Sequence, residues 1–350
     1  MQYIGIDIHR KFSEVNIMDE SGKEIERKRL EHNNPIELRE FFEKYSGASA
    51  TLEATVGWMW LADELEALGI DVHLAHSAGV KLIANSRLKT DKVDAKALAN
   101  LLRADFLPEA YLAPPDVRRQ REILRYRMAL VKMRSMAKNR IHAMLIRLNI
   151  HPTASDIFGK KGKEMLYALE LDEPYRRILV SWLELIDFLD CQLKSVEKVV
   201  KKNIIEDPRA KLLMTMPGIG LIMAYTIIAE VGEIERFRSD SAFASYCGLV
   251  PSTRQSADKV YHGRIGPAGR RTLKWAFVEA AHTAVRRDSY FASIYHKHEK
   301  PKGKGKAIVI VAHQMAKIVY QMLRDERPYK PRPKQRKKNS KVGPKSPMAG

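Results

Sequence analysis

The order of secondary-structure patterns in residues 1–75 constrains the fold of this chain more than any other feature. Three strand-like segments come first, and two helical segments then alternate with two further strands. In order, these are strands Tyr3–His9, Phe12–Asp19 and Glu24–His32, helix Pro35–Tyr45, strand Ala48–Ala54, helix Trp58–Leu68 and strand Asp71–Ala75. The pattern predicts an α/β domain with one mixed sheet.

This element order is that of the RNase H-like fold, in which the first and fourth strands lie side by side. After Pro114-Pro115 the pattern becomes helical. Asp116–Leu148 reads as one long helix with ten Lys or Arg and two acidic residues. Glu173–Lys202 reads as a second long helix. Its near-heptad apolar seam predicts a coiled-coil arm and consists of Ile178, Trp182, Leu185, Leu189, Val196 and Val199. The seam fits a dimer contact and ordinary packing within the chain equally well.

The remainder of the chain predicts a compact, mainly helical domain followed by a tail. The last two helices are expected over Ala268–Arg287 and Ala307–Arg324, and Gly248–Pro267 between the helical segments is expected to be irregular. From Arg327 onward the chain has nine Lys or Arg and no acid, so a disordered basic tail is expected. The predicted division is a catalytic domain at 1–152, a coiled-coil arm at 160–205, a C-terminal domain at 206–326 and a tail at 327–350.

Positive charge is concentrated in the later part of the chain. Residues 1–105 contain 14 Lys or Arg and 18 Asp or Glu, so of the net charge of +19 the remainder carries +23. Such a distribution favours a nucleic-acid partner over a role in solubility alone, because cations that neutralise phosphates release counterions. Four cations of the long basic helix are candidate nucleic-acid contacts: Arg118, Arg125, Arg134 and Lys138.

Four carboxylates fall on the elements that an RNase H-like sheet would bring together. Asp7 lies in an apolar strand, where an ionised group needs a cation or hydrogen-bond donors. Glu53 ends another apolar strand, and Asp91 and Asp94 lie one helical turn apart. Clustered carboxylates are suited to divalent cations such as Mg²⁺ or Mn²⁺. The plainer alternatives are a helix cap for Asp91, a first-turn charge for Asp94 and a solvated strand end for Glu53.

The segments Gly5–His9, Leu52–Thr55 and Lys89–Ala95 resemble the signature of the DEDD-type insertion-sequence transposases of the IS110 family, which includes the Piv DNA invertases. The resemblance extends to about residue 326. It implies an N-terminal domain similar to the junction resolvase RuvC. It also implies that the metal-binding tetrad consists of Asp7, Glu53, Asp91 and Asp94.

Residues Tyr246–Ser256 and Gly263–Leu273 resemble the C-terminal domain of the same family, in which a serine attacks DNA and forms a phosphoserine link. The flanking residues align that serine with Ser256. The family usually has glycine directly after it, whereas this chain has Ala257-Asp258, and Ser252 is the alternative. Cations that could hold a phosphate beside it are Arg254, Lys259, Arg264, Arg270 and Arg271.

The short motif Met216–Gly220 is similar to the turn of helix-hairpin-helix modules, in which glycines let the backbone approach a phosphate. A tight connection between two helices explains the motif equally well.

The resemblance implies a recombinase that acts on donor and target double-stranded DNA as a dimer or tetramer, guided by a structured RNA. The alternatives are a hydrolytic junction endonuclease and a non-catalytic nucleic-acid-binding protein. Met1–Asp7 lacks the features of a signal peptide, and no apolar run approaches the roughly 20 residues of a membrane helix. Cys191 and Cys247 form no metal-binding motif. We therefore expect a cytoplasmic protein of a bacterial or archaeal cell, associated with the nucleoid.

Overall fold

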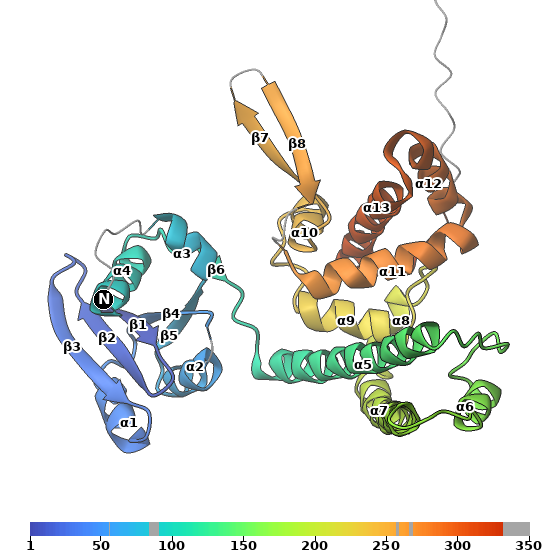
Figure 1. Ribbon diagram of the computed structural model, residues 1–350. Helices are drawn as coiled ribbons and strands as arrows, with labels where there is room; N and C mark the ends of the chain where they lie inside the picture. Colours follow the sequence, from blue (N-terminus) through green and yellow to red (C-terminus); the bar gives the residue numbers. More distant parts are fainter. Residues whose placement is uncertain (56, 84–90, 257–258, 266–268, 332–350) are drawn as a thin grey trace, which may run out of the picture. The chain divides into compact units, whose positions relative to one another are not determined.

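The computed structural model describes residues 1–55, 57–83, 91–256, 259–265 and 269–331, with the backbone alone for 91–93, 253–256, 259–262 and 264–265. The chain divides into two compact units, Met1–Ala113 and Pro114–Gly350, each of which can be followed in Figure 1.

The first unit is built on one mixed sheet in the strand order β3-β2-β1-β4-β5-β6. Strands β1, β4 and β5 run parallel, while β2, β3 and β6 pair antiparallel to their neighbours. Its elements are β1 (Tyr3–Ile8), β2 (Phe12–Met18), β3 (Glu24–Glu31), α1 (Pro35–Glu43), β4 (Ser49–Glu53), α2 (Trp58–Ala67), β5 (Asp71–Ala75), α3 (Ser77–Ile83), α4 (Asp91–Arg103) and β6 (Glu109–Ala110). The predicted mixed α/β sheet is confirmed, and β1 lies beside β4 as an RNase H-like order requires.

Side chains alternate between the two faces of the sheet along each strand. One face carries apolar side chains, and the other carries polar ones. On one face, side chains such as Ile4, Ile6 and Leu52 are fully buried and form a core with residues of α1 and α2. On the other face, Asn16 and Thr51 are fully buried although they are polar. In Figure 1, α4 lies on one side of the sheet and α1 and α2 lie on the other.

The second unit is mainly helical. Its elements are α5 (Pro115–Arg147), α6 (Lys160–Tyr167), α7 (Tyr175–Ile204), α8 (Pro208–Leu213), α9 (Leu221–Val231), α10 (Asp240–Tyr246), β7 (Pro251–Ser256), β8 (Lys259–Ile265), α11 (Arg271–Arg287), α12 (Ser289–Lys302) and α13 (Lys304–Asp325). A helical C-terminal region was predicted and is confirmed. No helix in the described ranges has both the length and the apolar character needed to cross a membrane.

Helices α5 and α7 pack against each other in antiparallel directions. Arg127 of α5 donates to Glu197 of α7, with the closer nitrogen 2.6 Å from Oε1, and Arg134 donates to Asp190 at 2.7 Å. The later residue on α5 therefore pairs with the earlier residue on α7. The seam of α7 is thus buried within the chain, and a coiled-coil contact between two chains stays a prediction.

The buried seam of α7 is shifted from the predicted one. Of the predicted seam residues, Leu189 and Val196 are buried, but the exposed fractions of Ile178 and Val199 are 41% and 44%. Residues of the true seam include Leu179, Leu183, Ile186, Leu189, Leu193, Val196 and Val200. The helix has two adjacent apolar stripes, and only its partner determines which one is buried.

Three expectations for the C-terminal region were wrong. Gly248–Pro267 was expected to be irregular, but β7 and β8 pair as an antiparallel hairpin. A helix before the last one, α12, was missed because its sequence is largely polar and carries Pro301 near its end. The tail was expected to be disordered from Arg327, but Tyr329 is buried and its hydroxyl donates to Asp288 at 2.9 Å. Residues 332–350 lie outside the described part.

Candidate active site

Asp7 lies on the polar face of the sheet. Its neighbours Ile6 and Ile8 point into the apolar core, so the alternation of β1 places Asp7 on the opposite face together with Gly5. The Asp7 side chain is 20% exposed, and its Oδ2 accepts a hydrogen bond from Nε2 of His9 at 3.1 Å. His9 in turn stacks on Phe12, with 4.6 Å between the ring centroids. This histidine is the next same-face residue after Asp7, a spacing that the sequence reading overlooked.

Glu53 is brought beside Asp7 by the parallel pairing of β1 and β4. Gly5 pairs with Thr51 and Ile6 with Leu52, so Asp7 and Glu53 are the next residues of their strands. Residues that pair across neighbouring strands lie on the same face of a sheet. Both acids therefore stand at the carboxyl ends of two adjacent parallel strands.

Helix α4 lies directly on β1 because residue 5 is a glycine. A Cβ atom at Gly5 would be 2.0 Å from the carbonyl oxygen of Ala95 and 2.5 Å from the backbone nitrogen of Ala99. Asp94 immediately precedes Ala95 and is partly buried. The backbone contact thus brings Asp94 to the face of the sheet that carries Asp7 and Glu53.

Asp91 begins α4, one turn before Asp94, and its side chain lies outside the described part of the chain. Among the side chains that the structure does describe, no three from His, Cys, Asp and Glu form a group that could hold a metal ion. The structure therefore places Asp7, Glu53 and Asp94 on elements that meet at one face of the sheet. The arrangement of these carboxylates around an ion stays a prediction.

A further carboxylate, which the sequence reading missed, lies next to Asp7. Glu14 of β2 is paired with Asp7 and is only 6% exposed. The antiparallel register of β2 is the signal that could have found it. Carboxylate oxygens are donors that hard divalent cations prefer, so the groups on this face are chemically suited to such an ion.

The two candidate serines lie at opposite ends of β7. Ser252 is the second residue of the strand, and its Oγ lies against Gly263 of β8. Ser256 ends β7 and pairs with Lys259 at the start of β8. Figure 1 shows the hairpin projecting from the helices of the second unit, with the last residues of β7 away from α10. The side chains of Ser256, Arg254, Lys259 and Arg264 lie outside the described part.

At the base of this hairpin, Arg270 is held in place by Tyr246. The Arg270 Nε donates to the Tyr246 hydroxyl at 3.0 Å, and its backbone nitrogen donates to the Tyr246 carbonyl at 2.9 Å. The interaction with Tyr246 raises the pKa of Arg270 against the opposing effect of burial, so the guanidinium stays charged. Arg271, which begins α11, is exposed.

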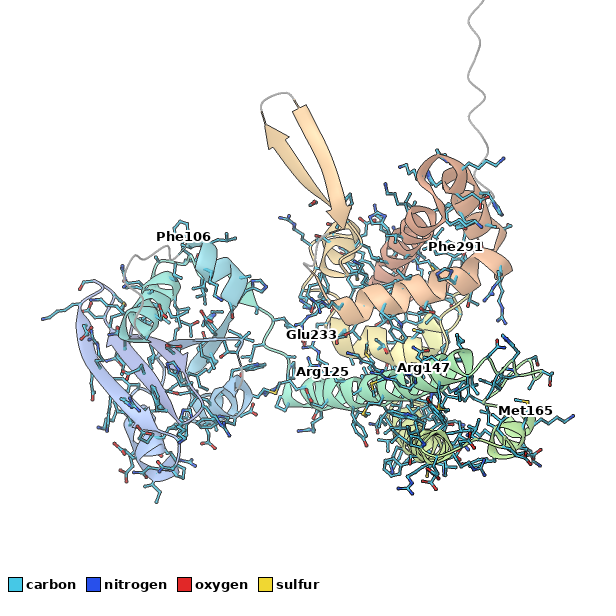
Figure 2. All side chains as sticks on the ribbon, in the orientation of Figure 1. Phe106, Arg125, Arg147, Met165, Glu233 and Phe291 are labelled. Carbon is cyan, nitrogen blue, oxygen red and sulfur yellow. The ribbon has the colours of Figure 1, made fainter. Side chains whose placement is uncertain are left out.

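The predicted nucleic-acid contacts of α5 differ in how accessible they are. Arg118 is only 6% exposed, and Arg134 is paired with Asp190. Arg125 is exposed and pairs with Glu122 on its own helix, and the Lys138 ammonium lies 4.9 Å from the Phe158 ring centroid. Figure 2 shows Arg125 and Arg147 toward opposite ends of this helix.

The glycine motif between α8 and α9 has a structural explanation. A Cβ atom at Gly218 would be 2.2 Å from the carbonyl oxygen of Ala280 on α11. Gly218 therefore allows close packing of this turn on a neighbouring helix, as the alternative of a tight connection expects.

Comparison with known proteins assigns both parts of the chain. A transposase family model of the DEDD type matches residues 4–150, and the model described as "Transposase IS116/IS110/IS902 family" matches residues 210–296. A transposase for insertion sequence element IS1328 of Yersinia enterocolitica is 26% identical over 290 residues, which cover 82% of this chain and 85% of the relative.

Two further relatives differ in the share of the chain that they cover. A probable family 20 transposase of Pseudomonas aeruginosa is 23% identical over 94% of this chain and 98% of its own length. The pilin gene-inverting protein of Moraxella bovis is 33% identical over 35% of this chain and 38% of its own length. The acidic face of the sheet and the serine-bearing hairpin lie in the two regions that these family models match. The chain belongs to the IS116/IS110/IS902 family of transposases and is an enzyme that acts on DNA.

Proposed function

We propose that this transposase cuts and rejoins DNA strands with a two-part active site: an acidic tetrad on a RuvC-like domain and a nucleophilic serine on the β7–β8 hairpin. The observation that carries the proposal is the approach of α4 to β1 at Gly5, which places Asp94 on the face that carries Asp7 and Glu53. Asp91, one turn earlier on α4, completes the tetrad.

The acidic part depends on divalent cations, Mg²⁺ or Mn²⁺. Bound ions of this kind polarise a scissile phosphate and stabilise the attacking and leaving oxygens. The negative charges of the four carboxylates attract and bind such ions. His9 restrains one oxygen of Asp7 through its 3.1 Å contact and so limits the rotation of that carboxylate.

The covalent step belongs to Ser256. Its Oγ attacks the phosphorus, an Oγ–P bond forms and the P–O bond to the departing strand breaks. The hydroxyl proton of Ser256 leaves to a base or solvent, and the departing oxygen takes up a proton. The phosphoserine ester keeps the bond energy, so the hydroxyl of another strand can reverse the step and join the strands. Ser252 is the second candidate, although its Oγ lies against Gly263 at the base of the hairpin.

The basic residues hold phosphates around these two parts. Arg271 is exposed beside the hairpin, and Arg125 lies on the surface of α5. We propose that donor and target DNA bind with a structured guide RNA, and that two or four chains act together because recombination exchanges several strands. The reaction takes place in the cytoplasm, on the nucleoid.

The experiment that tests this proposal traps the covalent intermediate. The full chain is incubated with donor DNA, target DNA and guide RNA from its own locus, and protein–DNA adducts are separated on denaturing gels. Adducts are expected with Mg²⁺ and are expected to disappear with EDTA, with Asp7→Asn and with Ser256→Ala. Ser252→Ala is the matched control and is expected to keep the adduct. An adduct that survives Ser256→Ala and disappears with Ser252→Ala moves the nucleophile to Ser252.

Two other functions give different results in the same assay. A hydrolytic junction endonuclease would still cut after Ser256→Ala and would form no adduct. A non-catalytic binding protein would be unaffected by Asp7→Asn. The pilin gene-inverting relative favours rejoining over hydrolysis, because inversion of a DNA segment leaves no broken ends.

A further inference from the structure

Glu14 is a buried carboxylate placed directly across from Asp7. The register of β1 and β2 pairs the two residues, and 6% of Glu14 is exposed. Cβ atoms of directly paired residues lie about 4.5–5.5 Å apart on one face of a sheet. Two carboxylates in this position repel each other, and burial strengthens the repulsion.

The Glu14 carboxylate has no direct partner among the described side chains. No hydrogen bond or ion pair of the Glu14 side chain is found among the described residues. Arg29 pairs with Glu14 across β2 and β3, but its Nε donates to Glu31 at 2.9 Å and its guanidinium lies 3.5 Å from the Phe12 ring centroid. The guanidinium paired with Glu14 on the neighbouring strand thus contacts Glu31 and Phe12.

A second polar group on the same face is also unsatisfied. Thr51, two residues before Glu53, is fully buried, and among the described atoms its Oγ1 has no hydrogen-bond partner. Buried polar atoms in folded proteins almost always have a partner. The Glu14 carboxylate and the unsatisfied Thr51 hydroxyl place oxygen donors on the face of the sheet that carries Asp7, and oxygen donors are the ligands that a hydrated divalent cation prefers.

We propose that Glu14 is a fifth carboxylate of the acidic site, and that it accepts hydrogen bonds from the water held by the cation at Asp7. This inference rests on the proposed metal-dependent function. Glu14 acts as a positioning residue, because it orients the cation's water and adds negative charge without being one of the four ligands. Carboxylates in such outer positions change metal affinity by about 10- to 100-fold when they are replaced.

The test measures Mn²⁺ binding to the full-length protein without nucleic acid, from the loss of the free-ion signal in electron paramagnetic resonance. Glu14→Gln keeps the shape of the side chain and removes its charge. We expect the Kd for Mn²⁺ to rise about tenfold or more. Glu66→Gln is the matched control, because Glu66 is exposed on α2 at the opposite face of the sheet, and it is expected to bind Mn²⁺ as the wild type does.

Thermal unfolding separates this role from a purely structural one. Without metal, Glu14→Gln should melt at the same temperature as the wild type or higher, because a like-charge repulsion is removed. With Mn²⁺, its increase in melting temperature should be smaller than that of the wild type. A lower metal-free melting temperature with unchanged Mn²⁺ affinity would overturn the proposal.

Asp7→Asn distinguishes a wrong role for Glu14 from a wrong metal site. If Asp7→Asn loses Mn²⁺ binding while Glu14→Gln keeps wild-type affinity, the role of Glu14 is wrong and the metal site stands. If both variants bind Mn²⁺ like the wild type, the acidic site itself is wrong.

Discussion

At the scale of single residues, Gly5 determines how closely the sheet and α4 approach. Ala95 and Ala99 are fully buried at this contact, and both are small. The glycine on β1 and the alanines on α4 let two backbones meet without a side chain between them. The position of Asp94 above the sheet therefore depends on a residue that carries no functional group.

We expect Gly5→Ala to lower the free energy of unfolding by about 2–3 kcal/mol, because the added methyl group would overlap the Ala95 carbonyl oxygen, and α4 would have to move. The same variant should lose Mg²⁺-dependent adduct formation, since Asp94 moves with α4. Urea unfolding and the adduct assay measure the two effects. Gly305→Ala is the control, because no atom lies within 4 Å of its Cβ position; an equal loss of stability in both variants would contradict the explanation.

Sequence reasoning found Asp7 because a carboxylate in an apolar strand is locally conspicuous. It missed the roles of Gly5 and Glu14, which arise from segments distant along the chain. Gly5 needs its contact with α4, about ninety residues later, and Glu14 needs the exact pairing of β1 with β2. A single sequence carries composition and periodicity along the chain, but it gives no distances between elements.

At the scale of elements, the helical pattern of α7 is a local property of the sequence, whereas the face that it buries depends on contacts with another helix. Its helical character and its length were predicted within two residues at each end, since the apolar period is a local property. Packing against α5 determines which of its two apolar stripes is buried. The contacts between the two helices include the Arg127–Glu197 and Arg134–Asp190 pairs.

Two neighbouring residues of α7 give a matched test of which face of the helix is buried. Leu189 is 2% exposed and Phe188 is 59% exposed. Leu189→Ala should lower the free energy of unfolding by about 2–4 kcal/mol, and Phe188→Ala by less than about 0.5 kcal/mol. Urea unfolding followed by circular dichroism gives both values. The reverse order would mean that the outer stripe is covered, as it would be in a dimer.

At the scale of the whole molecule, the C-terminal segment combines an anchor with a basic extension. Tyr329 stacks on Phe291 of α12, with ring centroids 6.0 Å apart, and its backbone nitrogen donates to Thr215 at 2.9 Å. Residues 332–350 contain seven Lys or Arg and no acid. The anchor therefore contributes to folding, and the extension contributes charge.

Two truncations separate these contributions. A chain ending at Pro331 should unfold at the wild-type temperature but bind DNA more weakly, with a shallower dependence of the binding constant on salt, because fewer counterions are released. A chain ending at Glu326 should in addition melt at a lower temperature, since the Tyr329 contacts are lost. Calorimetry and a salt titration of DNA binding measure these effects. Equal melting temperatures for the two truncated chains would argue against the anchor.

The contact of β1 with α4 also affects which sequence changes such a chain can tolerate during evolution. The distance between Asp7 and the helix that carries Asp94 is determined by the backbone contact at Gly5. It does not depend on the length of the polypeptide that connects β1 to α4. Insertions and deletions in the loops between β2 and α3 can then accumulate while the carboxylates keep their spacing. A side chain larger than hydrogen at position 5, or one larger than a methyl group at Ala95 or Ala99, would push the acidic groups apart.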